Sequence, residues 1–142
     1  MVILGGLQLL TPPRQTEIQP FKFCAHHHQY IEQHIQRPIP EHQVQILVHQ
    51  SYTNPRIKGS THQLTQDQYI IHLNQYWKHE HTSTMDHELI HVKQMVHLEL
   101  ERIPLTHIWL WKGDTINWNQ PYLDRPWEKE ARLKSARNHT NH

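Results

Sequence analysis

The stretch His87-Glu88-Leu89-Ile90-His91 guides the interpretation of the whole chain, because it has the pattern H-E-x-x-H. On a helix, residues four positions apart lie on the same face, so His87 and His91 can both reach one metal ion. Glu88 follows His87 on the winding, where its carboxylate can reach a water on the metal rather than the metal itself. Two imidazoles that hold zinc, and a carboxylate that takes a proton from the bound water, are the groups that metal-assisted hydrolysis requires.

The residues around this stretch predict the helix that the pattern needs. Segment 82–84 (Thr-Ser-Thr) offers N-caps, and Ser83 and Asp86 have the spacing of a capping box. Arg102 and Pro104 are expected to end the helix. Apolar residues recur at helical spacing and predict a stripe on a different face from the two histidines: Met85, Leu89, Val92, Val96 and Leu100.

The chain contains 16 histidines among 142 residues, so two of them at this spacing can arise by chance. Chance is a poorer explanation for three further features: the glutamate inside the motif, the amphipathic helix around it and a further ligand later in the chain. Together these features favour a catalytic metal site. The run His26-His27-His28 can bind metal adventitiously, but we interpret it as a solvated helix face. A soluble His-rich metal buffer is a further alternative, and it would bind several weak ions per chain.

Length and composition limit the classes of protein to which the chain can belong. At 142 residues it is expected to form one domain with its own core. The formal net charge is +1 and the basic residues are scattered, which argues against nucleic-acid binding. The single cysteine, Cys24, excludes an intramolecular disulfide, and we interpret it as a small buried residue rather than a nucleophile.

The N-terminal segment Met1–Leu10 is apolar, but it is too short to span a bilayer and lacks the basic start and cleavage site of a signal peptide. We therefore expect no membrane span, and a cytoplasmic or virion-associated protein. Residues 1–20 are expected to form an N-terminal arm or strand, residues 21–138 the folded domain, and residues 139–142 a frayed tail. The sequence leaves the oligomeric state open.

Ahead of the motif, the sequence predicts one helix and two strands. The helix is expected from Phe21 to Arg37, before Pro38. Alternating apolar residues predict strands at 44–49 and 69–73. The second strand either offers a free edge to an extended peptide or serves as an ordinary core strand. Between the two strands, Asn54-Pro55 and Gly59-Ser60 are expected to bracket a loop.

After the motif, Gly113-Asp114 predicts the turn of a β-hairpin, and a last helix is expected from Trp127 to Arg137, with Pro126 in its first turn. The aromatic residues of the hairpin favour core cover over the wall of a substrate cleft, although both interpretations stay open. Those expected to share one face are Trp109, Trp111, Ile116 and Trp118. The order of these elements predicts an α+β fold with a small sheet on one side.

A catalytic zinc needs three protein ligands and one open position, so a third ligand must come from elsewhere in the chain. The last helix offers Glu128 and Glu130. Residues two apart on a helix point in different directions, so only one of the two can face the metal.

The motif H-E-L-I-H-V-K-Q from His87, followed by R-P-W-E-K-E-A from Arg125, resembles the gluzincin group of zinc metallopeptidases, and among them small, poorly characterised bacterial and phage members. The resemblance covers roughly residues 69–137. It implies a zincin-like single domain in which a small, mostly antiparallel sheet packs on the motif helix. It also implies that the C-terminal helix supplies the third ligand, Glu128, with Glu130 as the runner-up. Many gluzincins carry an Asp four residues after this Glu to orient the first histidine, but this chain has Arg132 there.

The resemblance and the motif together predict a zinc metallopeptidase that hydrolyses peptide bonds of a peptide or protein substrate, with one zinc ion per chain. Glu88 would act as the general base, while zinc and a nearby donor would stabilise the oxyanion. The candidates for that donor are Tyr122, His107 and His72, in that order. The competing hypothesis is a non-catalytic, zinc-stabilised binding or virion-associated module.

Overall fold

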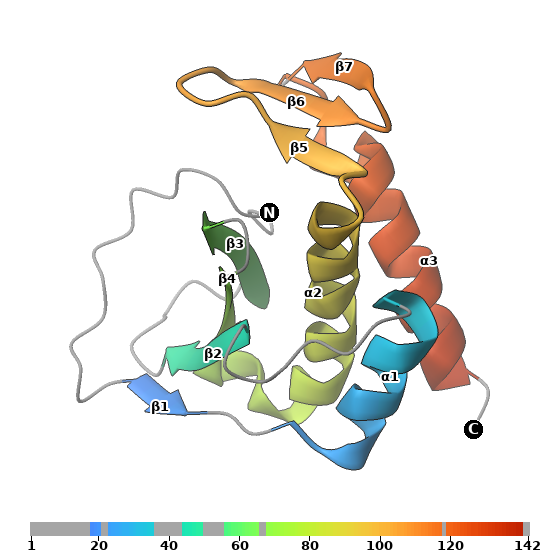
Figure 1. The fold of residues 1–142 in the computed structure, drawn as a ribbon. Coiled ribbons are helices and arrows are strands. Elements are labelled where there is room, and N and C mark those ends of the chain that lie inside the picture. The colour runs from blue at the N-terminus through green and yellow to red at the C-terminus, as the bar shows by residue number, and fades with distance from the viewer. Residues whose placement is uncertain are drawn as a thin grey trace.

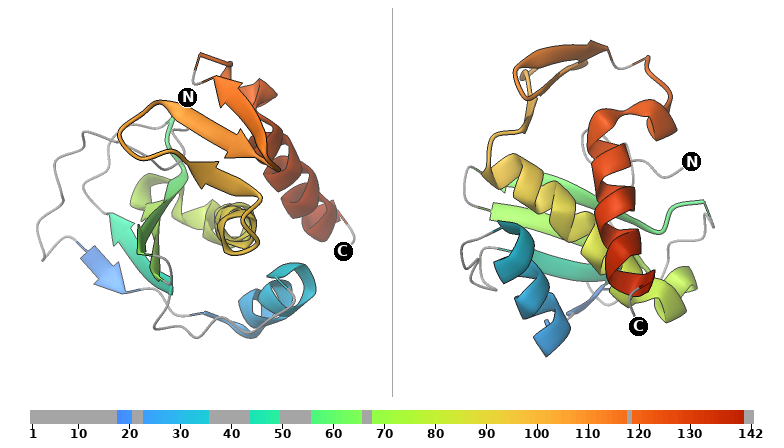
Figure 2. Two further views of the ribbon diagram at one scale, coloured as in Figure 1. Left: turned by 45° about the horizontal axis from the view of Figure 1, so that its top comes forward. Right: turned by 90° about the vertical axis from the view of Figure 1, so that its right-hand side faces the viewer.

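The computed structural model describes residues 18–20, 23–35, 44–49, 56–65, 68–117 and 119–140. Helix α2 (His81–Val96), which carries the H-E-x-x-H stretch, runs between the first β-sheet on one side and helices α1 (Ala25–Ile35) and α3 (Pro126–Thr140) on the other (Figure 1). A second, smaller sheet forms one end of the molecule (Figure 2). Three α-helices and two small sheets in the described part of the chain agree with the expected α+β class.

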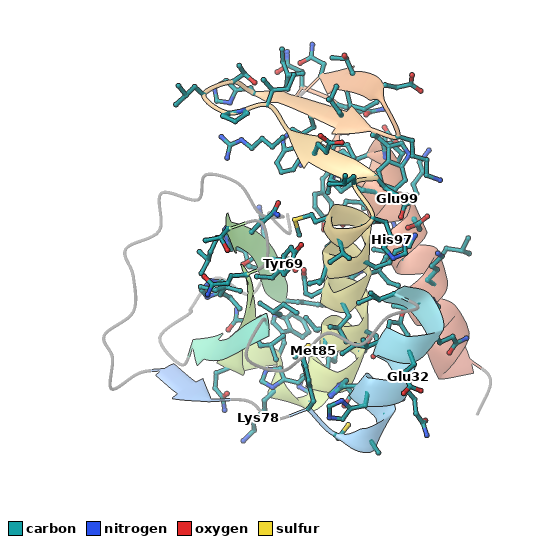
Figure 3. All side chains as sticks on the ribbon, viewed as in Figure 1. Glu32, Tyr69, Lys78, Met85, His97 and Glu99 are labelled. Atoms are coloured by element: carbon teal, nitrogen blue, oxygen red, sulfur yellow. The ribbon has the colours of Figure 1, made fainter. Side chains whose placement is uncertain are left out.

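The main core lies between the first sheet and α2. Tyr69, Ile71 and Leu73 project from alternate positions of strand β4 (Gln68–Asn74) and are almost completely buried, in a cluster that includes Met85 and Leu89 from α2. Figure 3 shows Tyr69 and Met85 in this layer, whereas Glu32 of α1 and Lys78, before α2, lie on the outside. The alternation predicted for residues 69–73 is thereby confirmed.

The first sheet is mixed, with strand order β1-β2-β4-β3. Strand β1 (Ile18–Pro20) pairs antiparallel with β2 (Val44–His49), which runs parallel to β4; β3 (Gly59–Thr65) pairs antiparallel with β4. Two of the three pairings are antiparallel, and the strand predicted at 44–49 is confirmed. The described part of the expected N-terminal arm, β1, therefore belongs to this sheet.

Strand β3 was expected to begin as a loop, and this prediction is wrong. Its sequence, GSTHQLT, is mostly polar and lacks the apolar alternation that indicates a strand. Only its first three residues are buried, and two of them are polar. As a consequence β4 lies between two partners and offers no free edge, and β3 is the edge strand on that side of the sheet.

Both ends of α2 differ from the prediction. The helix begins at His81, directly after the 3-10 helix η3 (Gln75–Glu80), so Ser83 lies inside it and forms no capping box. It ends at Val96, because Leu98 adopts a left-handed φ of 57° and the Glu99 N–H donates to the Gln94 carbonyl at 2.8 Å. The predicted stripe is buried at Met85, Leu89 and Val92, partly buried at Val96, and Leu100 lies in the next strand.

Helix α1 is shorter than predicted, but its apolar side is buried at Tyr30, Ile31 and Ile35 as expected. The prediction of a solvated histidine face is wrong for His27, which is 1% exposed and whose Nδ1 accepts the N–H of Cys24 at 3.3 Å. Cys24 itself is exposed rather than buried, because it stands before the helix begins.

The second sheet contains strands β5 (Leu100–Arg102), β6 (Ile108–Trp111) and β7 (Asp114–Asn117), all antiparallel. The predicted hairpin is confirmed, but its turn residues are Lys112 and Gly113, both at positive φ, because Asp114 already pairs with Trp111. Trp109 and Trp111 pack against Trp127, and their ring centroids lie 5.7 and 6.4 Å, respectively, from the centroid of the Trp127 ring. This packing favours the interpretation as core cover; Trp118 lies outside the described residues.

Helix α3 begins at Pro126 and extends to Thr140, beyond the predicted end at Arg137. The 3-10 helix η4 (Tyr122–Asp124) precedes it. None of the described helices is long and apolar enough to cross a membrane.

Candidate metal centre

The two histidines of the motif and the carboxylate of Glu128 converge at one point between α2 and α3. The Nε2 atoms of His87 and His91 lie 3.2 Å apart. Glu128 approaches both of them, with its Oε1 2.8 Å from His91 Nε2 and its Oε2 3.2 Å from His87 Nε2. His87, His91 and Glu128 are therefore a group that can hold a metal ion, and we call them the metal triad.

The metal triad is buried on one side and open on the other. His91 and Glu128 are completely buried, whereas the side chain of His87 is 19% exposed. Carboxylates and imidazoles are seldom buried together without a cation or a full set of hydrogen bonds. The group can therefore hold an ion inside the fold, and His87 marks the side from which solvent can reach it.

The separations within the metal triad are short enough for one metal ion to contact all three side chains. Two ligands held tetrahedrally about 2.0–2.1 Å from one ion lie about 3.3 Å apart, close to the three distances above. In the described part of the chain the group comprises three ligands and no fourth, which leaves room for a water or a substrate atom. Two imidazoles and one carboxylate are a donor set that binds zinc in other proteins.

Gln94 fixes the orientation of His91. Its Nε2 donates to the Trp127 carbonyl at 2.9 Å and to Glu130 at 3.3 Å, so its Oε1 must accept the Nδ1–H of His91 at 2.8 Å. With the proton on Nδ1, the Nε2 atom is the one available to a metal. Sequence reasoning assigned Gln94 no role, although it stands in the quoted motif at the end of the H-V-K-Q run.

The choice between the two glutamates of the last helix follows from their partners. Glu128 faces the histidines, whereas Glu130 accepts from Lys93 Nζ at 3.0 Å. Glu128 holds its place because the preceding Trp127 is buried between the second sheet and α2. The carbonyl oxygen of Trp127 also accepts a hydrogen bond from Gln94 Nε2. The aromatic hairpin thus positions the third ligand through Trp127.

Charges within the metal triad perturb its acid–base behaviour. Burial by itself lowers the pKa of His91, but the charge of Glu128 and their hydrogen bond outweigh burial and raise this pKa to about 9. Burial would raise the pKa of Glu128, yet the charge of His91 and hydrogen bonds from both histidines hold it well below its usual range. In the protein without metal, His91 is therefore protonated and paired with the Glu128 carboxylate. The imidazole must lose this proton when a metal ion binds.

Glu88 is buried beside the metal triad without belonging to it. Its carboxylate accepts a hydrogen bond from the Thr61 hydroxyl, which comes from the edge strand β3. Burial raises the pKa of Glu88, although the nearby charges of His91 and His87 and the bond from Thr61 lower it in part. Sequence reasoning missed Thr61, because nothing in its polar strand indicates that it faces α2.

Gly59 allows β3 to approach α2 closely at this point. A Cβ atom on Gly59 would lie 2.8 Å from Thr84 Cγ2 and 2.9 Å from the His72 carbonyl oxygen, with Glu88 Cγ at 3.5 Å. Such contacts are too short, so a larger residue would push the strand away from Glu88. The sequence alone placed Gly59 only at the end of an expected loop and gave it no role beside Glu88.

Tyr122 is the one proposed oxyanion donor that lies beside the metal triad. Its hydroxyl hydrogen-bonds to Glu128; burial, followed by the charges of Glu128 and Glu88, raises its pKa above the usual range. Arg125 lies over its ring at 5.7 Å, and Arg132 donates to the neighbouring Leu123 carbonyl at 2.7 Å. Arg132 therefore supports the turn that carries Tyr122.

The two other candidate donors lie elsewhere. His72 alternates with the core residues of β4, so it points away from α2, and its ring packs against His62 at 5.2 Å. His107 lies in the exposed turn between β5 and β6.

Comparisons with models of protein families, with curated proteins and with solved structures found no match to this chain. The metal triad and its surroundings are therefore the basis on which function is argued.

Proposed function

We propose that this protein is a zinc-dependent metallopeptidase of the gluzincin type, which hydrolyses peptide bonds with Glu88 as the general base. The observation that carries this proposal is a buried carboxylate next to a His-His-Glu group that it does not join. A site that only holds an ion has no use for such a carboxylate, whereas a hydrolase needs one.

The residues divide the work according to their positions. His87, His91 and Glu128 would hold zinc, which when bound supplies a Lewis acid that polarises a carbonyl and lowers the pKa of a water to about 7. Glu88 would take the proton from the attacking water and pass it to the leaving amine. Its raised pKa suits this role, because a base works best when its pKa approaches the working pH.

Tyr122 would donate a hydrogen bond to the oxygen on which negative charge develops. It is suited to this role because its hydroxyl, with a pKa raised by burial, keeps its proton at neutral pH. The hydrogen bond to Glu128 places the hydroxyl within reach of the triad.

The edge strand β3 supports a peptide as the substrate. Its first residues lie against Glu88 and its last three, Gln63, Leu64 and Thr65, are exposed. An extended peptide that added to this edge would run past the general base, and its backbone would be bound without regard to its sequence. The edge thus takes the part that was one of the two alternatives for residues 69–73.

A non-catalytic, zinc-stabilised binding module is the second candidate. The observation in its favour is that the metal triad joins α2 to α3 inside the molecule, where an ion would hold both helices together.

The substitution Glu88→Gln separates the two candidates. With a mixed peptide library analysed by mass spectrometry, we expect the variant to keep its zinc and to lose hydrolysis by at least about a hundredfold. The matched control is Glu32→Gln, on the exposed side of α1, which should cleave like the wild type. If Glu88→Gln cleaves as fast as the wild type, the mechanism is wrong. If the wild type binds zinc and cleaves nothing, the binding module is favoured.

A further inference from the structure

The turn between β5 and β6 presents a leucine entirely to solvent. Leu105 is 103% exposed, and the apolar residues that flank the turn, Ile103 and Ile108, are each more than one third exposed. Leu105 also has a φ of 63°, a conformation that glycine and asparagine adopt more readily than leucine does. The position therefore holds a residue that favours neither the backbone conformation nor contact with water.

Hydrogen bonds within the turn hold this conformation. The Ile103 N–H donates to the Ile108 carbonyl at 3.1 Å, and the Thr106 hydroxyl donates to the Ile103 carbonyl at 2.7 Å. The Ile108 N–H in turn donates to the Thr106 hydroxyl oxygen at 3.1 Å. The turn is thus a fixed apolar projection, which we call the leucine turn (Ile103–Ile108).

The shape and place of the leucine turn limit what can bind it. The second sheet, to which it belongs, forms one end of the molecule, away from the layer that holds the core (Figures 1 and 2). A convex projection cannot enclose a small ligand, which needs a concave site. It needs a partner that closes around it, such as the acyl region of a bilayer or an apolar pocket of a protein.

The charges behind the leucine turn favour a lipid surface. Residues 102–113 include no Asp or Glu. Arg102, whose guanidinium lies 6.0 Å over the ring of Trp109, is the charged residue nearest the turn in the β5–β6 pairing, and His107 lies within the turn. The acidic Glu101 and Asp114 lie further back along β5 and β7. Apolar residues at the tip, with an arginine behind them, match the acyl and headgroup layers of an anionic membrane.

We infer that the leucine turn docks this protein, peripherally, on anionic lipid membranes. Leu105 would enter the acyl boundary while Arg102 contacts the anionic headgroups. The inference is independent of the proposed function, because none of these residues belongs to the metal triad or contacts Glu88.

Co-sedimentation of the full chain with phosphatidylcholine vesicles, with and without phosphatidylserine, tests the inference. We expect binding to the vesicles that contain phosphatidylserine and weaker binding as salt is raised. Leu105→Ser should reduce the partition coefficient at least about tenfold, because a leucine loses its burial. Arg102→Gln should reduce it by a factor of about five, the value of one basic residue near an anionic surface.

The matched control is Leu133→Ser, which changes a leucine that is 54% exposed on α3, and it should bind like the wild type. Circular dichroism of each variant checks that it is folded. The inference is overturned if the wild type stays in the supernatant with both kinds of vesicle. It is also overturned if Leu105→Ser and Leu133→Ser bind equally well, or if phosphatidylserine has no effect.

Discussion

Two polar clusters join α2 to its neighbours, and they are built in different ways. The first is the metal triad. The second, the lysine cluster, consists of Lys93, Glu99, Glu130 and Lys112. Lys93 Nζ lies 2.6 Å from Glu99 and 3.0 Å from Glu130, while Lys112 lies 3.6 Å from Glu99. Its two positive and two negative charges balance one another without help from outside.

The metal triad is balanced in another way, because without metal its positive charge is the proton that His91 carries. Its two imidazoles and one carboxylate face one another at 2.8–3.2 Å, and that proton must leave when a metal ion binds. The difference shows how α2 can carry one cluster in which a metal ion can replace the proton of His91 and another cluster whose cations are lysines. Stability should therefore depend on metal at the first and on lysine at the second.

Metal removal should have the largest effect. When zinc is present at about a thousand times its dissociation constant, binding should add about 4 kcal/mol to the free energy of unfolding. A chelator should remove this contribution from the wild type and from Glu130→Ala, whereas Glu128→Ala should melt at the same temperature with and without zinc. Differential scanning calorimetry measures all three. If the melting temperature of the wild type does not change when zinc is removed, the distinction between the two clusters is contradicted.

Loss of the buried lysine should have the next largest effect. Lys93→Met leaves Glu99 and Glu130 without their closest cation, and we expect a loss of about 3 kcal/mol in urea unfolding. Zinc content should not change, because the lysine cluster does not share a ligand with the metal triad. Lys134→Met, at the edge of the cluster and 3.9 Å from Glu130, is the control and should cost less than about 1 kcal/mol. Zinc loss in Lys93→Met would mean that the clusters are one unit.

Proton release should distinguish the two clusters further. In the protein stripped of metal, the pKa of His91 is raised to about 9, so the imidazole is protonated at neutral pH and must lose its proton to bind zinc. Zinc affinity should therefore fall about tenfold for each pH unit below that pKa. Isothermal titration in two buffers with different heats of protonation measures the released proton. An affinity that is constant between neutral pH and the pKa of His91 would contradict the raised value.

The smallest effect is expected at Thr61, which connects the edge strand to Glu88. Thr61→Val keeps the shape but removes the donor, so we expect a loss of about 1 kcal/mol in stability and unchanged zinc content. Peptide hydrolysis should decrease through kcat rather than KM. Thr61→Ser keeps the hydroxyl and should recover most of the hydrolysis. Equal behaviour of the two variants would exclude a role for the hydrogen bond.

The sequence predicted those parts of the site that depend on local spacing. His87, Glu88 and His91 follow from the period of one helix, and Glu128 follows from a resemblance whose motif covers a second helix. The structure brings these residues to one place. Thr61 and Gly59 could not be predicted, because their contact with α2 depends on how a polar strand packs after the chain has folded.

The ends of α2 also differ from what the local sequence predicts. The segment around Ser83 has a sequence that caps helices, but here it lies inside one, because η3 leads directly into α2. At the other end, Leu98 takes the left-handed position that glycine usually occupies. Packing overrides both local signals, since residues on nearly every side of α2 are buried by another element.

Metal content per chain tests the central claim most directly. It should be measured by elemental analysis on protein purified without a metal-affinity step, beside His91→Ala, Glu128→Ala and Glu130→Ala. We predict about one zinc ion in the wild type and in Glu130→Ala, as expected of a three-ligand site, and none in the other two variants. Several ions per chain, barely changed by any of the variants, would contradict the metal triad and assign binding to the many other histidines.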